Sequence, residues 1–197
     1  MSAAFFPRYF GKSYPRAVRG EGCYLFDAGG KKYLDAAGGA AVVTIGHGVA
    51  AIGEAMAAQA RRLAFVHTSQ FLTEEAERLA ARLRALAPAN FREGRVFFTS
   101  GGSEAVETAI KLCRQYWLER GEPRRTRIVS RWQSYHGATL GALALSGNVK
   151  RREPYAPLLP EWGHIAPCYC YRCPLGLTYP TCDVACAQEL EKFIDTA

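Results

Sequence analysis

Apolar residues recur at intervals of three and four positions in several stretches of the chain, a spacing that places them on one face of a helix. The clearest stretch follows Ser103, where the apolar positions are Ala105, Ala109, Leu112, Cys113 and Tyr116. Thr73, followed by several glutamates, is an expected helix N-cap. The pattern predicts helices over residues 49–63, 73–87, 103–120 and 139–145, and another that starts near residue 183.

Shorter runs of strand-favouring residues predict β-strands. Residues 23–27 and 32–35 flank Ala28-Gly29-Gly30, which is typical of a β-hairpin. Residues 96–99 and 127–130 predict two more strands, and the alternation of strands with helices from residue 94 onward indicates a parallel α/β sheet. Residues 1–20 are expected to form a loosely ordered arm. The proline-rich stretch after Asn148 is expected to be irregular until the last helix.

The predicted strand at 96–99 leads into a helix through the turn Ser100-Gly101-Gly102-Ser103. Glycines let the backbone approach a ligand closely, and the N–H groups at a helix N-terminus attract anions. Ser103 adds a hydroxyl donor, so the turn is typical of a phosphate site. The alternative is an ordinary strand-to-helix turn with a serine cap and Glu104 placed to complement the helix dipole. The turn is neither a Walker loop nor Gly-x-Gly-x-x-Gly, so a nucleotide is not indicated.

The loop after the predicted strand at 127–130 contains Tyr135, His136 and Gly137. If this strand lies beside the strand at 96–99, both following loops open at the same edge of the sheet. An aromatic ring would then lie above whatever ring carries the phosphate, an arrangement that suits pyridoxal 5′-phosphate (PLP). Taken singly, Tyr135 is equally well a packed loop tyrosine, and a lone histidine such as His136 is more often a structural hydrogen-bonding group than a catalyst.

These motifs, taken in order, resemble the class III (ω-amino acid:pyruvate type) PLP-dependent aminotransferases. The resemblance covers nearly the whole chain and rests on residues 21–27, 33–35, 46–48, 96–116 and 135–139. It implies an incomplete fold-type-I PLP transferase of the α/β class. Residues 1–48 would form the N-terminal arm and part of the small domain, including the hairpin. Residues 49–197 would form the first part of the PLP-binding large domain, with a cysteine-rich excursion at 166–186.

The resemblance assigns roles to the residues of the turn and of the loop. Gly102 and Ser103 would hold the cofactor phosphate, with Gly101 and Glu104 supporting the site. In the loop, Tyr135 would stack on the pyridine ring of the cofactor, and His136 and Gly137 would shape the pocket around that ring.

One further position concerns the substrate. At Ala41, in the glycine-rich turn before Gly46-His47-Gly48, some amine-active relatives carry a bulky aromatic residue. The smaller side chain suggests a roomier substrate pocket in this chain.

The reaction that the resemblance implies is transfer of an amino group from an amine or ω-amino acid to a keto acid such as pyruvate. The enzyme would be a homodimer in which the segment from Phe65 to Phe71 lies near the neighbouring subunit's cofactor. Members of the family are about twice as long. Their Schiff-base lysine and the acid that pairs with the pyridine nitrogen lie beyond the point where this chain ends, so no catalytic residue is expected in it. None of the lysines of this chain lies in a sequence context like that of the family's Schiff-base lysine. These lysines are Lys12, Lys31, Lys32, Lys111, Lys150 and Lys192.

Two classes of alternative remain open. On the same scaffold, the enzyme could be an aminomutase or a decarboxylase. From a different class, the chain could be a non-catalytic remnant or a thiol–metal binding module built on a cofactor fold.

Cysteines are concentrated near the end of the chain. Cys23 and Cys113 stand alone and are expected to be small core or near-core residues. The others form a cluster that could hold zinc or an iron–sulfur group, could be structural thiols, or could form disulfides. These five are Cys168, Cys170, Cys173, Cys182 and Cys186.

Composition narrows the function classes. Of the 197 residues, 49% are apolar, which is typical of a globular protein with a core. The net charge of +7 comes from scattered basic pairs and a short run with acids between them, and no nucleic-acid motif accompanies them. There is no apolar run long enough to span a membrane and no signal-peptide pattern, so a cytoplasmic protein is expected.

Overall fold

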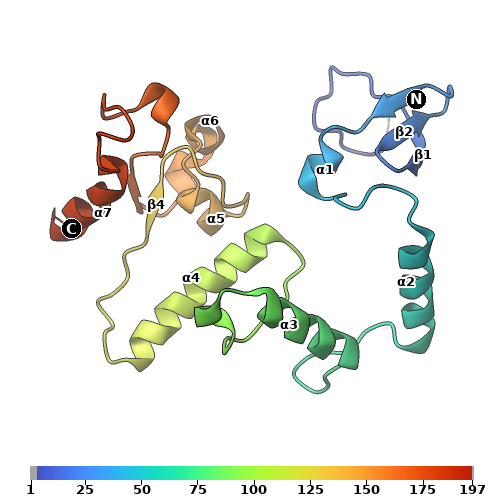
Figure 1. Cartoon of the computed structure of the whole chain (residues 1–197), viewed down its shortest axis with the longest axis horizontal. Helices are drawn as coiled ribbons and strands as arrows, with labels where there is room; N and C mark the ends of the chain where they lie inside the picture. Colours follow the sequence, from blue (N-terminus) through green and yellow to red (C-terminus); the bar gives the residue numbers. More distant parts are fainter. Residues whose placement is uncertain (1–3, 197) are drawn as a thin grey trace. The chain divides into compact units, whose positions relative to one another are not determined.

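The computed structural model describes residues 4–196 (Figure 1). The chain divides into two units between Arg92 and Glu93. The division predicted at residue 48 concerns the domains of the whole fold and stays a prediction.

Unit 1 begins with a three-stranded antiparallel sheet of β1 (Ala17–Glu21), β2 (Tyr24–Asp27) and β3 (Lys32–Leu34). The strands β2 and β3 confirm the predicted hairpin. The prediction of a loosely ordered arm over residues 1–20 is wrong for the last four of them, because β1 pairs with β2. The guanidinium of Arg19 lies 3.8 Å from the ring centroid of Phe26 and adds a cation–π contact between these strands.

The glycine turn at 46–48 is attached to this sheet. His47 exchanges backbone hydrogen bonds of 3.0 and 2.7 Å with Gly22, and its Nε2 lies 2.9 Å from Oδ2 of Asp35. The hydrogen bond from His47 holds the pKa of the Asp35 carboxyl below its ordinary value. A Cβ at Gly20 would lie 2.6 Å from Cβ of His47, so only glycine leaves room for the histidine.

The elements that follow the sheet in unit 1 are helical. The first, α1 (Gly38–Ala41), is a left-handed turn, since all four of its residues have φ between 51° and 64°. The helices α2 (Ala50–Arg62) and α3 (Glu74–Leu86) agree with the predicted helices to about one residue at each end. Thr73 caps α3 as predicted, because its side chain accepts a hydrogen bond of 3.4 Å from the N–H of Ala76. A 3₁₀ turn, η1 (Ala89–Phe91), follows α3.

Unit 2 contains the long helix α4 (Gly102–Glu119) and a parallel pair of strands, β4 (Val129–Arg131) and β5 (Gly163–Ile165). Between the strands lie α5 (Leu140–Leu145), α6 (Val149–Arg152) and the 3₁₀ segment η2 (Glu153–Leu158). After β5 come η3 (Cys170–Arg172) and α7 (Ala185–Thr196). The buried core of this unit is formed by Ala142–Leu145 of α5, by Ser146 and by Ile165 of β5.

Two sequence predictions for this unit are wrong. Residues 96–99 form no strand with any described residue, because no neighbouring backbone pairs with them, and the side chain of Phe97 is 75% exposed. The stretch after Asn148 is more regular than predicted, since it contains α6 and β5. The strand β5 is short and contains a glycine and a histidine, so its sequence alone does not indicate a strand. The partner of β4 is therefore β5 and not residues 96–99.

The prediction that Cys23 and Cys113 are core or near-core residues is also wrong, because both are exposed. Cys23 lies in the tight turn between β1 and β2. Cys113 lies on the apolar face of α4, which borders an open groove of about 810 Å³ together with Ile110, Trp117 and Val129. Among the described helices, none has the length and apolar character needed to cross a membrane.

Candidate cofactor site

The candidate site starts at the N-terminus of α4. Gly101 is the N-cap residue, and the first helical hydrogen bond runs from Ala105 N–H to Gly101 C=O over 3.0 Å. The N–H groups of Gly102, Ser103 and Glu104 precede that bond and have no acceptor within the helix. A Cβ built on Gly101 or Gly102 meets nothing within 4 Å, so this end of the helix is open to a ligand. The helix dipole makes an anion the favoured ligand there.

Glu104 holds the turn that precedes the helix. Its carboxylate accepts a hydrogen bond of 3.0 Å from the N–H of Ser100 and a second one from the hydroxyl of the same serine. These bonds lower the pKa of the Glu104 carboxyl, the side-chain bond most of all. The hydroxyl of Thr99 donates to Gly101 C=O over 3.1 Å. The turn is therefore fixed by its own polar side chains.

Ser103 joins the turn to the second loop. Its hydroxyl oxygen accepts a hydrogen bond of 3.0 Å from the N–H of Ala138, which is 35 residues further along the chain. The hydroxyl proton is then available to donate to a ligand. The backbone at Gly137 comes so close that a Cβ there would lie 2.6 Å from the Ser103 oxygen and 2.8 Å from Cβ of Ala142. The structure thus brings Ser103 and Gly137 together, although the strand pairing from which the sequence argument started does not form.

His136 is a structural hydrogen-bonding group in this arrangement, which was one of the two sequence interpretations. Its Nε2 lies 3.0 Å from the hydroxyl of Ser130, and its backbone N–H donates to the hydroxyl of Ser146 over 2.8 Å. Ser146 is fully buried and also donates to Ala142 C=O over 2.9 Å. The loop is thereby anchored to β4 and to the buried end of α5.

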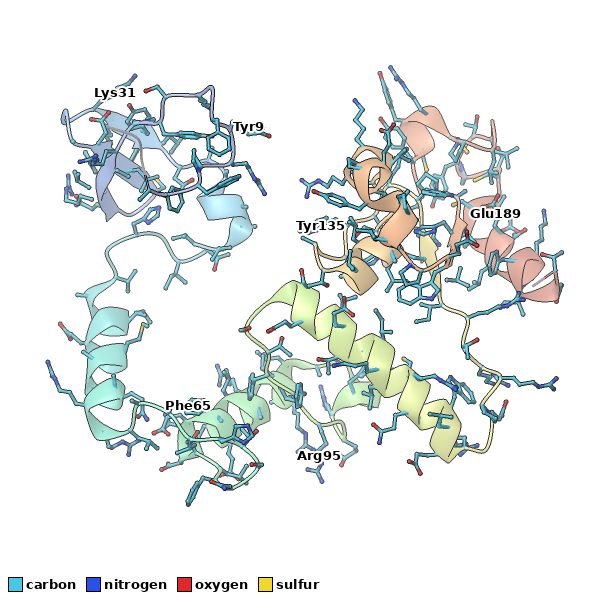
Figure 2. All side chains as sticks on the ribbon, turned by 180° about the vertical axis from the view of Figure 1, so that it is seen from behind. Tyr9, Lys31, Phe65, Arg95, Tyr135 and Glu189 are labelled. Carbon is cyan, nitrogen blue, oxygen red and sulfur yellow. The ribbon has the colours of Figure 1, made fainter. Side chains whose placement is uncertain are left out.

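The side chain of Tyr135 extends from the anchored loop into solvent. It is 61% exposed, and the guanidinium of Arg151 lies 5.0 Å from its ring centroid. Figure 2 shows Tyr135 on the part of unit 2 that faces the N-terminal end of α4. An exposed ring beside the open helix end is what stacking on a bound cofactor requires.

Glu107, one turn after Ser103 in α4, was not among the residues predicted from the sequence. Its Oε1 accepts 2.6 Å from the hydroxyl of Thr139 and 3.1 Å from the N–H of Ala142. The bond from Thr139 is the largest cause of the lowered pKa of this carboxyl, and the charge of Lys111 acts in the same direction. The spacing of four residues, which places Glu107 on the same helix face as Ser103, was the only signal in the sequence.

The remaining predicted positions lie outside this group. Ala41 belongs to unit 1, where it ends the left-handed turn α1 with φ 64°. Within residues 4–196, no group of three or more histidine, cysteine, aspartate or glutamate side chains is placed to hold a metal ion. The five clustered cysteines have free thiols, and most of them line a depression of about 20 Å³: Cys170, Cys173, Cys182 and Cys186.

Comparison with known proteins gives the family. Residues 10–196 match the family Aminotransferase class-III. The chain is 40% identical over 172 residues to the uncharacterized aminotransferase YodT of Bacillus subtilis, a match covering 87% of this chain and 38% of YodT. Among solved structures, it resembles an (S)-enantioselective omega-transaminase from Thermomicrobium roseum, with a TM-score of 0.89, 37% identity and coverage of 99% of this chain and 44% of that one.

A second solved structure is an amine transaminase from an uncultivated Pseudomonas species in its PLP-bound form. The TM-score is 0.87 at 35% identity, and the match covers all of this chain and 44% of that one. The chain thus spans less than half the length of these relatives, and its fold is a partial fold-type-I α/β domain. With the family match extending over residues 10–196, the chain belongs to the class III aminotransferases.

Proposed function

We propose that this chain is the part of a PLP-dependent aminotransferase that binds the phosphate and one face of the cofactor ring. The observation that carries the proposal is the hydrogen bond from Ala138 N–H to the Ser103 hydroxyl. That bond places the Tyr135 loop beside the open N-terminus of α4, and it leaves the hydroxyl proton of Ser103 to donate to a ligand.

The residues present fit a phosphate ester with a flat ring. Three consecutive N–H groups, from Gly102 to Glu104, and one hydroxyl meet at the start of a helix of 18 residues. Space for the ligand is kept by Gly101 and Gly102, where an added Cβ would meet nothing. A phosphate dianion would be bound by these donors and by the helix dipole. Tyr135 would offer its ring face to the pyridine.

When bound, PLP supplies the electron sink that allows bonds at an amino carbon to break. The residues of this chain bind and orient it: the α4 N-terminus holds the phosphate, Glu104 keeps the preceding turn in place, and His136 and Gly137 position the loop. The lysine for covalent attachment and the acid that pairs with the ring nitrogen would come from residues outside this chain.

We further propose that the whole enzyme moves an amino group from an amine or ω-amino acid to a keto acid such as pyruvate. The support is the likeness to solved amine and omega-transaminases at 35–37% identity. Ala41 would lie in the substrate pocket. Phe65 and Phe71 are largely exposed in unit 1, as an interface segment of a homodimer would be.

The proposal is tested by comparing PLP with pyridoxal, which has the same ring and aldehyde but no phosphate. Both are titrated into the purified chain, with inorganic phosphate as a competitor. We expect PLP to bind more tightly than pyridoxal, phosphate to displace PLP, and Ser103→Ala to weaken PLP about threefold to tenfold. Equal affinities for the two aldehydes, with no effect of phosphate, would mean that the α4 turn is only a helix start.

A further inference from the structure

The proposed cofactor site leaves Glu107 without a role. This half-buried carboxylate lies on α4 one turn after Ser103, and it accepts hydrogen bonds from Thr139 and Ala142, 32 and 35 residues away in the chain. Both donors belong to the start of α5, directly after the Tyr135 loop. Glu107 and Ser103 together therefore make three hydrogen bonds from one face of α4 to residues 138–142.

The start of α5 depends on this outside acceptor. Thr139 is the N-cap residue of α5, but its side chain makes no capping hydrogen bond. Its hydroxyl donates to Glu107 instead. The N–H of Ala142, in the first turn of α5, lacks a helical acceptor and is satisfied by the same carboxylate oxygen. A glutamate on α4 thus does the work that an N-cap side chain normally does within its own helix.

The sequence of α5 leaves room for this carboxylate. A Cβ at Gly141 would lie 2.5 Å from Oε2 and 2.8 Å from Oε1 of Glu107. Glycine in a helix is destabilising relative to alanine by roughly 0.5–1 kcal/mol. Gly141 therefore costs helix stability at a position where an added Cβ would collide with the Glu107 carboxylate.

We propose that Glu107 is a positioning residue that holds the loop from Tyr135 to Thr139 against the N-terminus of α4. In doing so it would align the ring of Tyr135 and the hydroxyl of Ser103 toward one ligand. The alignment toward a ligand rests on the proposed function, whereas the holding of the loop by Glu107 does not.

The experiment uses four variants of the chain: Glu107→Ala, Glu107→Gln, Gly141→Ala and the double variant Glu107→Ala/Gly141→Ala. Glutamine keeps an acceptor oxygen where Oε1 lies. Gly141→Ala keeps every polar group and removes only the space. Glu119→Ala, at the other end of α4, is the matched control. Amide hydrogen exchange at Ala138 and Ala142 reads the position of the loop, and PLP titration reads its effect on the ligand.

We expect Glu107→Ala and Gly141→Ala each to speed exchange at both amides and to weaken PLP binding about tenfold. Glu107→Gln should restore most of the protection, and Glu119→Ala should change neither reading. In the Glu107→Ala background, Gly141→Ala should cause no further loss, because the clash is gone.

Unchanged amide exchange at Ala138 and Ala142 in both Glu107→Ala and Gly141→Ala would overturn the proposal. Faster exchange with unchanged PLP affinity would reduce Glu107 to a cap of α5 and overturn the positioning role. If the wild-type chain binds no PLP, the proposed function fails, and the exchange rates still decide whether Glu107 holds the loop. If Glu107→Ala does not fold, Gly141→Ala gives the same decision, with Glu107→Gln as the variant that keeps the acceptor.

Discussion

Gly137 and Gly141 give side chains of α4 the space to reach the loop and helix that follow β4. Ser103 reaches past Gly137 to the N–H of Ala138, and Glu107 reaches past Gly141 to the N–H of Ala142. An added Cβ would lie 2.6 Å from the Ser103 oxygen at Gly137, and 2.8 Å from Oε1 of Glu107 at Gly141. The docking of the loop on α4 thus depends on the two glycines, which have no side chain, as much as on the polar side chains of Ser103 and Glu107.

Gly137→Ala should weaken PLP binding more than Ser103→Ala does. The new Cβ would meet the Ser103 oxygen, and the φ of +142° at this position is one that alanine rarely adopts. Strain of this kind costs about 1–3 kcal/mol, so we expect an affinity loss of about tenfold or more. Titration with PLP measures it. The control is Gly53→Ala on α2, where an added Cβ meets nothing within 4 Å, and it should leave the affinity for PLP unchanged. If Gly53→Ala weakened PLP binding equally, the loss in Gly137→Ala would reflect a general loss of stability.

The Glu107 carboxylate predicts a pH dependence. Its pKa is lowered in the folded chain, chiefly by the hydrogen bond from Thr139. A group with a lowered folded pKa stabilises the fold above its unfolded value, which is about 4.3 for glutamate, and this contribution is lost as pH falls toward the folded value. Wild type should therefore lose more stability than Glu107→Gln between pH 7 and pH 3.5. Urea unfolding at the two pH values checks this, and parallel losses would contradict it.

At the scale of elements, periodicity predicts what is local and misses what needs a distant partner. The helices α2, α3 and α4 repeat their apolar positions every three or four residues, and they form within about a residue of the predicted bounds. Residues 96–99 have strand-favouring side chains, but a strand forms only when another backbone pairs with it. The strands β4 and β5 pair although Val129 and Gly163 are 34 residues apart in the chain. Neither short sequence indicates that the other strand is its partner.

The same division applies to the candidate site. Ser103, Tyr135 and Gly137 stand in motifs that can be read from a few neighbouring residues. Glu107 could not be recognised in this way, because its partners Thr139 and Ala142 are brought to it only by the folded chain.

The left-handed turn α1 predicts an unusual response to substitution. Ala40 and Ala41 both have φ near +63°, a conformation that costs an L-residue roughly 1–2 kcal/mol and glycine little. Replacing either alanine by glycine should therefore stabilise unit 1 by about 1 kcal/mol. Ala37→Gly is the matched control, since Ala37 has φ −91° and should lose stability. Chemical denaturation ranks the three, and destabilisation by all of them would show that the turn is not strained.

At the scale of the whole molecule, large apolar side chains remain exposed in both units. Examples are Met56 on α2 at 69% and Leu112 on α4 at 65%. Apolar area exposed on this scale marks an interface or a liability to aggregate. The chain spans less than half the length of its relatives, and we expect a fragment that supplies the remaining part of such a relative to cover these faces.

The purified chain should accordingly show no transaminase turnover with alanine and a keto acid, because the attachment lysine is expected elsewhere. It should also be prone to aggregation, so that size-exclusion chromatography shows a growing share of large species as the concentration of the chain rises. Adding a fragment that supplies the remaining part of a family member should reduce aggregation. Turnover by the chain alone, free of host enzymes, would refute the first expectation. A sharp monomer peak with a cooperative thermal transition would refute the second.

The central claim is that the N-terminus of α4 and the loop docked on it bind a phosphate group. The most direct measurement is the change in amide chemical shifts when inorganic phosphate is added to the isotope-labelled chain. We expect saturable shifts at the amides of Gly102, Ser103, Glu104 and Ala138, and smaller shifts in Ser103→Ala. Saturable shifts confined to the basic segment from Arg124 to Arg127, with the α4 amides unmoved, would contradict it.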